Sequence, residues 1–264
     1  MPEATVVARS LTYRVGDATL VAGVDFEATH GELVAVIGPN GAGKSTLLNL
    51  LAGNLRPTEG HVLLDGVDTS DALPGDLALL RSMLTQREPI DIPYTAAQVV
   101  QIGRFPHRRD ENNSASQDAA AVAEAMESTD TTQFAARIYA TLSGGEQTRV
   151  SLARVLAQDT PIVFLDEPTT ALDVAHQERV MREAVRVSRQ HRAVVVVLHD
   201  LNSAAIHADR IVLMNQGAVV AGGLPSDVLQ QDLLTTVYAQ PMVVVDHPFR
   251  DCPLVLTADR SPRT

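Results

Sequence analysis

Uninterrupted apolar runs mark three short segments of the chain. They cover residues 33–37, 162–165 and 193–198 and are rich in valine, leucine and isoleucine. A run of this length and composition is typical of a strand that is buried on both faces, as in a parallel sheet covered by helices. We therefore predict that the three runs are strands of one α/β sheet.

Each apolar run ends at a glycine or at a polar side chain. Gly38, Asp166 and His199 directly follow the three runs. The carboxyl ends of parallel strands lie at the same edge of a sheet, where ligands bind in α/β proteins. We therefore expect these three distant segments to converge on one site.

The rest of the chain changes its pattern twice. Residues 5–36 alternate β-rich runs with turn residues, which predicts antiparallel strands, and a helix is expected from Lys44 to about Ala52. Residues from about 87 to 157 are helical in pattern, with helix formers concentrated at 119–127. We predict one α/β domain over 1–264, with an antiparallel β-subdomain and an inserted helical subdomain at about 87–157.

Composition and charge restrict the possible partners. The 264 residues are 45% apolar, which suits a globular domain, and 21 basic against 32 acidic side chains give a net charge of −11. This balance argues against broad electrostatic binding to nucleic acid or to an anionic membrane. No apolar run approaches the roughly 20 residues of a membrane span. The one cysteine, Cys252, fits a reducing cytoplasm.

A phosphate-binding loop follows the first apolar run. Its sequence fits the pattern G-x-x-x-x-G-K-[ST], in which backbone N–H groups and a helix N-terminus face phosphate oxygens. Lys44 is expected to reach the β- and γ-phosphates, and the Ser45 hydroxyl to coordinate Mg²⁺. The predicted nucleotide-binding residues here are Gly38, Pro39, Asn40, Gly41, Ala42, Gly43, Lys44, Ser45 and Thr46.

An acidic pair follows the second apolar run. Asp166 at a strand end can hold Mg²⁺, and Glu167 can orient the water that attacks the γ-phosphate or accept its proton. Solvated acids at a strand end are common, but the upstream phosphate loop makes this pair informative. We predict a metal site at Ser45 and Asp166 and a catalytic role for Glu167.

A second glycine-containing helix start lies at Ser143, Gly144 and Gly145, ahead of a helical run with apolar residues on one face. The segment 142–147 resembles the signature motif of ATP-binding cassette (ABC) ATPases. The resemblance covers essentially the whole chain and implies a P-loop NTPase fold. It also implies a head-to-tail homodimer, in which ATP lies between Lys44 of one subunit and Ser143 of the other. Thr148 departs from the family pattern, where a second glutamine is common.

Four further residues match ABC positions, and the resemblance implies their roles. Tyr13 resembles the residue that stacks on adenine, although an ordinary strand tyrosine is the alternative. Gln86 resembles the glutamine that senses Mg²⁺ and the attacking water, which makes it both a catalytic and a metal-site candidate. Asp173 resembles the residue of the loop that crosses the dimer interface. His199 resembles the switch histidine that contacts the γ-phosphate.

The resemblance also implies the biological setting. A single cassette without a fused membrane domain resembles an importer subunit at the cytoplasmic side of the membrane, bound to a separate permease dimer. A soluble cassette ATPase that moves no solute is the alternative from another class. The stretch between Lys44 and Ser143 is too short for a long coiled-coil arm, which disfavours the DNA-repair members.

Four segments narrow the cargo. Residues 103–107, 175–177, 198–202 and 245–248 resemble the ATP-binding subunits of haemin importers. Importers of ferric siderophores and of cobalamin share the first and third segments, so these cargoes stay open. A periplasmic or lipid-anchored haem-binding protein is then an indirect partner. We expect His107, His176 and His247 to be surface or turn residues and not haem ligands.

The stretch 104–109 is the one conspicuous basic cluster of the sequence. It contains Arg104, His107, Arg108 and Arg109, and acidic residues follow it directly. A solvated face and a permease-docking surface are equally compatible with this pattern.

Overall fold

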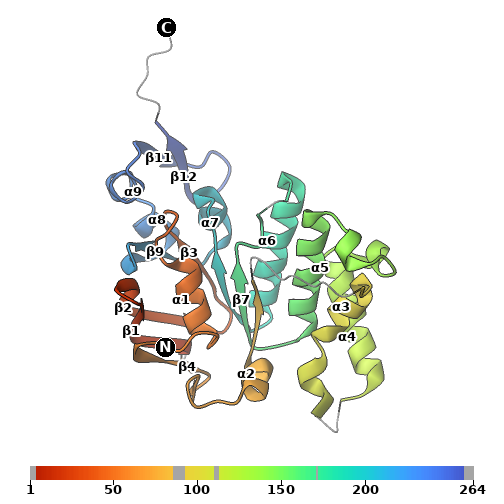
Figure 1. Cartoon of the computed structure of the whole chain (residues 1–264). Helices are drawn as coiled ribbons and strands as arrows, with labels where there is room; N and C mark the ends of the chain where they lie inside the picture. The colour runs from red at the N-terminus through yellow and green to blue at the C-terminus, as the bar shows by residue number, and fades with distance from the viewer. Residues whose placement is uncertain (1–3, 86–92, 110–112, 171, 259–264) are drawn as a thin grey trace.

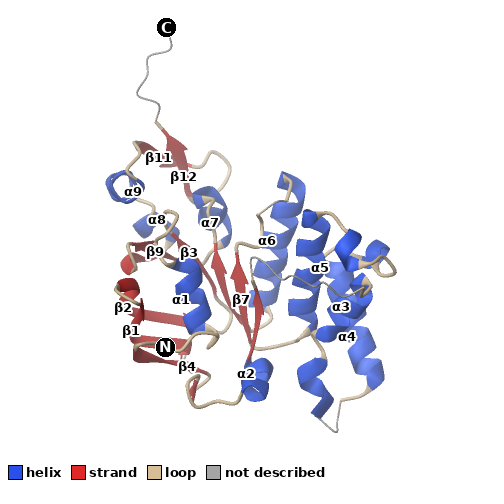
Figure 2. Ribbon diagram, in the orientation of Figure 1, coloured by secondary structure: helices blue, strands red, loops and turns tan. Residues whose placement is uncertain are grey.

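Two large sheets, a two-stranded sheet near the carboxyl end and a group of helices build the protein (Figures 1 and 2). The computed structural model describes residues 4–85, 93–109, 113–170 and 172–258. Within this part, no helix is both long enough and apolar enough to cross a membrane.

The larger sheet has six strands in the order β10-β9-β3-β8-β7-β6. Five strands are parallel and β10 is antiparallel to β9. All residues of β3, β7 and β8 are buried, which confirms the prediction from the three apolar runs. The strands are β3 (Leu33–Ile37), β6 (Arg81–Leu84), β7 (Ile162–Asp166), β8 (Ala193–Val197), β9 (Arg210–Asn215) and β10 (Ala218–Gly223).

The smaller sheet is antiparallel and has the order β2-β1-β4-β5. Its strands are β1 (Ala4–Val15), β2 (Ala18–Thr29), β4 (Glu59–Leu64) and β5 (Val67–Asp68). The antiparallel pattern predicted for residues 5–36 therefore ends with β2, because β3 joins the parallel sheet. Helix α1 (Lys44–Leu51) lies between the two sheets, and four of its leucines share one apolar core with β1, β2, β3 and β8.

Helices fill the stretch between β6 and β7. They are α3 (Ala96–Ile102), α4 (Ala115–Ser128) and α5 (Gly144–Ala157), with 3₁₀ turns at Phe105–Arg109, Thr132–Phe134 and Tyr139–Thr141. Buried side chains of all three helices form a core of their own. Helix α4 begins before the stretch 119–127, where helix formers are concentrated, because Ser114 and Gln117 form a capping box that fixes its first turn.

The other face of the six-stranded sheet packs on α6 (Val174–Arg189) and α7 (Leu201–His207). The chain then ends in two short helices and a hairpin beside α7 (Figure 1). The remaining elements are α2 (Pro74–Leu80), α8 (Pro225–Val228), α9 (Gln231–Tyr238), β11 (Met242–Asp246) and β12 (Pro253–Thr257).

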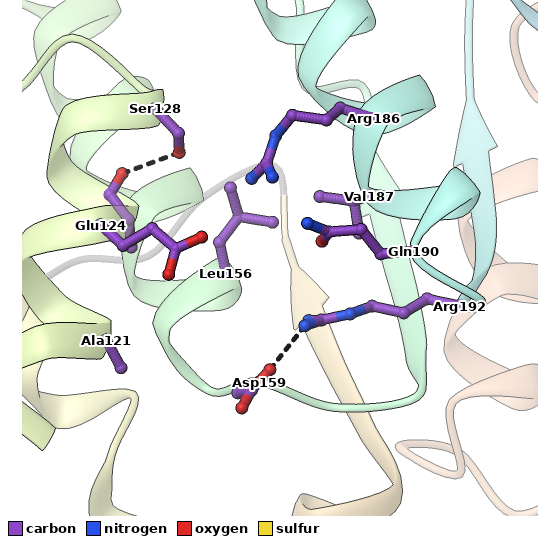
Figure 3. Close-up of a pocket in the computed structure, with 10 residues that line it drawn as sticks. Ala121, Glu124, Ser128, Leu156, Asp159, Arg186, Val187, Gln190 and Arg192 are labelled. Carbon is purple, nitrogen blue, oxygen red and sulfur yellow. Dashed lines mark hydrogen bonds and ion pairs between the residues drawn. The ribbon is translucent and has the colours of Figure 1, made fainter. Parts of the chain in front are cut away.

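A small polar cavity marks the seam where α4 and α5 meet α6 (Figure 3). Its volume is about 80 Å³, which holds only a few water molecules. Glu124 of α4 faces it from one side and Arg186 of α6 from the other, and Arg192 pairs with Asp159 at 2.5 Å. The cavity is too small for a nucleotide, so the candidate site must lie elsewhere.

Candidate nucleotide site

The segment 38–43 connects β3 to α1 and carries the predicted phosphate loop. Its backbone takes left-handed conformations at Gly38, Gly41 and Gly43, with φ of 149°, 79° and 95°. A Cβ atom on Gly38 would lie 2.2 Å from the Met214 carbonyl oxygen, and one on Gly43 would lie 2.4 Å from that of Leu20. Both positions therefore require glycine, for backbone conformation as well as for space.

Neighbouring strands support this loop through backbone hydrogen bonds that sequence analysis missed. The Gly217 N–H, in the turn between β9 and β10, donates to the Ala42 carbonyl at 3.0 Å, and the Gly217 carbonyl accepts from the Ala22 N–H at 2.9 Å. Tyr238, at the end of α9, also forms a hydrogen bond with the backbone of Gly38. Burial raises the pKa of Tyr238 to about 12, and this hydrogen bond opposes the shift. The Asn215-Gln216-Gly217 turn was visible in the sequence, but its spatial partner was not.

Lys44 lies at the first position of α1 and is buried. Its Nζ donates to the carbonyl oxygens of Gly38 and Pro39 at 2.8 and 3.0 Å. Burial lowers the pKa of Lys44, and the carboxylates of Glu167 and Asp166 partly offset this effect. The ammonium group is therefore held over the loop, on the side where the two acids also lie.

Ser45 and Asp166 meet at the same place. The Ser45 hydroxyl donates to Asp166 Oδ1 at 3.0 Å, although the two residues are 121 positions apart. Burial raises the pKa of Asp166, and the Ser45 hydrogen bond opposes this shift. A buried carboxylate beside a hydroxyl is a pair of hard oxygen donors that a bound cation would stabilise. These two residues fit Mg²⁺.

Glu167 and His199 form the second pair of the site. His199 Nε2 lies 2.5 Å from Glu167 Oε1, and the Glu167 side chain is 10% exposed against 45% for His199. Glu167 has a left-handed φ of 50°, which is uncommon for a residue with a side chain. The Thr170 hydroxyl donates to Glu167 Oε2 at 3.3 Å. The predicted convergence of three strand ends is therefore observed.

The second helix start lies apart from this cluster. Figure 1 shows α5 with α3 and α4 on one side of the molecule and α1 on the other. Ser143 caps α5, accepting from the Glu146 N–H at 3.4 Å and donating its own N–H to the Glu146 carboxylate at 2.7 Å. Ser143 and Gly144 are exposed. Among the described residues, no hydrogen bond or ion pair joins residues 143–145 to the phosphate loop of the same chain.

Two other candidates lie near the edges of the site, and Gln86 lies outside the described residues. Asp173 is exposed and caps α6, where the His176 backbone N–H and ring hold its pKa below the usual value. Tyr13 on β1 is half-buried and pairs with Val21 of β2. The carbonyl oxygen of Leu20, the residue before Val21 in β2, lies against Gly43. The pairing of β1 with β2 therefore brings Tyr13 near the phosphate loop.

The basic cluster at 104–109 proves to be structural in part. Arg104 is buried, pairs with Asp118 at 2.8 Å and donates to the Ala157 carbonyl at 2.9 Å. His107 Nε2 lies 2.7 Å from the Gln158 carbonyl oxygen. For Arg104 both predicted readings are wrong, because its charge is directed into the junction of the three helices and away from solvent.

Comparison with known proteins defines the class. The family profile described as ABC transporter matches residues 21–170, more than half of the chain. The protein belongs to this family and is an ATP-hydrolysing, nucleotide-binding cassette with the P-loop NTPase fold that the sequence predicted.

More specific similarities follow from individual proteins. The hemin import ATP-binding protein HmuV of Nocardia farcinica is 52% identical over 88% of this chain and 80% of its own length. An inward-facing metal-chelate type ABC transporter superposes with a TM-score of 0.83 at 25% identity, over 98% of this chain and 99% of the other. A dimeric bacterial ABC transporter cassette gives a TM-score of 0.74 at 30% identity, over 83% and 98%.

Proposed function

We propose that the protein is the ATPase subunit that powers haem import through a separate membrane permease. The observation that carries this proposal is the 52% identity with a hemin import ATP-binding protein along most of both chains. The similarity to a metal-chelate transporter supports it, because haem is itself a metal chelate. Ferric siderophore or cobalamin import is the alternative within the class.

The site residues divide the work of hydrolysis. Backbone N–H groups of 38–46 and the Lys44 ammonium bind the β- and γ-phosphates, and Tyr13 stacks on adenine. Glu167 orients the attacking water and accepts its proton as the bond between the γ-phosphorus and the bridging oxygen breaks. His199, 2.5 Å from Glu167, contacts the γ-phosphate. Gln86, which lies outside the described residues, is the remaining catalytic candidate.

Ser45 and Asp166 would hold Mg²⁺, together with Gln86. When bound, the ion would neutralise charge on the β- and γ-phosphates. The support from this chain is the 3.0 Å contact between the two oxygen donors and the raised pKa of the buried Asp166 carboxyl, which a nearby cation would lower.

The site is completed by a second copy of the chain. The exposed capping turn at Ser143, with Gly144 and Gly145, offers free backbone N–H groups at the start of a long helix. In a head-to-tail dimer these groups bind the γ-phosphate held by the partner, and Asp173 lies in the loop that crosses the interface. The dimeric cassette in the comparison supports this arrangement.

The cargo does not bind this chain in our proposal. The cassette is peripheral on the cytoplasmic side of the membrane and docks on a permease dimer, which receives haem from a periplasmic or lipid-anchored binding protein. Three of the four segments that resemble haemin importers support the fold: Arg104 joins helices, the His176 N–H donates to the cap residue of α6, and Asn202 exchanges two hydrogen bonds with the Val255 backbone. The haem assignment therefore rests on the overall similarity.

Reconstitution with the permease in liposomes tests the cargo. We expect haem-loaded binding protein to stimulate ATP hydrolysis, and ferric-siderophore-loaded or cobalamin-loaded protein to leave the basal rate unchanged. Empty binding protein is the matched control. Stimulation by siderophore alone would overturn the haem assignment and keep the transport function. A cassette that stays in the soluble fraction when the permease is co-expressed would overturn transport itself.

A further inference from the structure

A cleft of about 290 Å³ lies between α6 and α7, next to the proposed catalytic pair. Glu167 and His199 line it, and so do Glu178 of α6 and His207 of α7. Two histidine–carboxylate pairs therefore share one cleft. The first pair has a proposed role in hydrolysis, and the second has none.

His207 is a buried side chain with one polar atom left unsatisfied. Its Nδ1 lies 2.9 Å from the Ser203 carbonyl oxygen and must carry the hydrogen, because a carbonyl only accepts. Its Nε2 has no hydrogen-bond partner among the described residues, and the side chain is only 8% exposed. Such an atom is costly to bury and requires an explanation. The nearest charged group is Glu178 Oε2, at 3.4 Å.

The two helices that this contact joins carry the catalytic loops. Gln177 of α6 donates to the carbonyls of Thr169 and Leu172, which attaches the loop after Glu167 to α6. Asp200, directly after His199, caps α7 by accepting from the Asn202 N–H. Each loop is thus attached to its own helix, while the cleft separates the helices beside the loops. The relative position of α6 and α7 then sets how Glu167 meets His199.

We propose that His207 and Glu178 are positioning residues for hydrolysis, which hold α7 against α6 and thereby align His199 with Glu167. The inference rests on the catalytic roles proposed above for those two residues. Neither His207 nor Glu178 belongs to the phosphate loop or to the other residues proposed to bind the nucleotide. The contact between His207 and Glu178 is attractive when Nε2 carries a proton as well as Nδ1. The other ionisable groups that line the cleft are Glu167, His199 and Asp200.

Two amide substitutions test the contacts of the two ring nitrogens of His207 one at a time. In His207→Asn the amide can still donate to the Ser203 carbonyl, but no group reaches Glu178. We expect kcat of the isolated cassette to fall about tenfold, because even a small misplacement of catalytic groups slows the reaction, while the KM for ATP stays within about twofold. In His207→Gln the longer amide reaches the Nε2 position, donates to Glu178 and restores most of kcat.

Arg182→Ala is the matched control. Arg182 is the other partner of Glu178, at 3.6 Å, but does not line the cleft, so we expect wild-type kcat. Wild-type kcat in His207→Asn would overturn the inference, as would an equal loss of kcat in the Gln and Asn variants. Glu167→Gln, measured in the same cargo-free assay, tests the catalytic assignment separately. If it hydrolyses ATP normally, that assignment fails; if it is inactive while His207→Asn is not, only the positioning role fails.

Discussion

Lys44 is the only lysine in the sequence, where every other basic side chain besides histidine is an arginine. The compact ammonium group of lysine suits this position, since it binds two carbonyl oxygens of its own loop from inside a buried site. The guanidinium group of arginine instead spreads its charge over a planar fork of donors. Lys44 therefore places the one ammonium group among the side chains of the sequence at the phosphate loop.

Replacing Lys44 by Ala should weaken nucleotide binding itself. A charge-assisted hydrogen bond contributes about 1.5–3 kcal/mol, so we expect the Kd for Mg²⁺-ATP to rise about 10- to 100-fold. Titration with a fluorescent ATP analogue measures the change, and a thermal melt checks that the fold is retained. An unchanged Kd would remove Lys44 from the phosphate site.

The single lysine also allows a direct readout in the unmodified protein. An amine-reactive ester can label one side chain, Lys44, and the amino terminus serves as an internal standard. Bound ATP should protect Lys44 and leave labelling of the amino terminus unchanged, as measured by mass spectrometry of the digested protein. At a reagent concentration that labels Lys44 in the ATP-free protein, equal labelling with and without ATP would contradict the assignment.

How far the sequence predicts a site residue depends on how local its constraints are. The glycines, Lys44 and Ser45 follow from one short motif, because successive positions of one loop bind the same phosphates and cation. The Glu167–His199 contact follows from the shared edge of parallel strands. The support from Gly217 and the cleft at His207 could not be predicted, since they depend on which distant segments pack together.

At the scale of elements, Arg104 joins three helices. It follows α3, pairs with Asp118 of α4 and donates to the Ala157 carbonyl at the end of α5. Gly103 allows the end of α3 to lie directly against α5, since a Cβ atom at this position would lie 2.2 Å from the Arg154 carbonyl oxygen. Sequence patterns predicted the helices, but not this junction, because the partners of Arg104 lie 14 and 53 residues along the chain.

Arg104→Ala should therefore destabilise the protein by about 2–4 kcal/mol, because the Ala157 carbonyl loses its Arg104 donor and Asp118 keeps, among the described residues, only the hydrogen bond from Asn113. Urea unfolding at neutral pH measures the loss. Arg108→Ala is the matched control: Arg108 is exposed and lies 5.3 Å over the Phe105 ring, so we expect a change within about 0.5 kcal/mol. Equal effects of the two substitutions would mean that Arg104 does not hold the helices together.

The order of the strands shows a similar limit. Apolar runs identify β3, β7 and β8 as buried strands, yet β3 lies between β8 and β9 although these come more than 150 residues later. The apolar pattern of a strand predicts that the strand is buried, but it does not predict which strands lie beside it. The boundaries of the helical subdomain likewise stay a prediction from the sequence, although α3, α4 and α5 share a core.

At the scale of the whole molecule, a chain of net charge −11 must bind a polyanion and then a second copy of itself. Bulk electrostatics oppose both events, so binding depends on local groups: oriented backbone N–H groups, Lys44 and the Mg²⁺ site. ATP is then expected to join two chains that otherwise repel each other, because its phosphates face the phosphate loop of one and the Ser143 helix start of the other.

Glu167→Gln should stop the cycle with the dimer closed. The amide cannot accept the proton of the attacking water, so we expect hydrolysis to fall about 100-fold or more while ATP binding is kept. Size-exclusion chromatography with light scattering should then show twice the mass of one chain with Mg²⁺-ATP, and a monomer with Mg²⁺-ADP. Raising the salt from about 0.05 to 0.5 M should favour the dimer, because screening weakens the repulsion between two acidic chains.

Adding Ser143→Arg to Glu167→Gln is the control: it should abolish the dimer and keep ATP binding, since Ser143 serves the partner's site. If Glu167→Gln stays monomeric with ATP at every salt concentration, the two-chain site fails, and Ser143 is only the cap of its own helix.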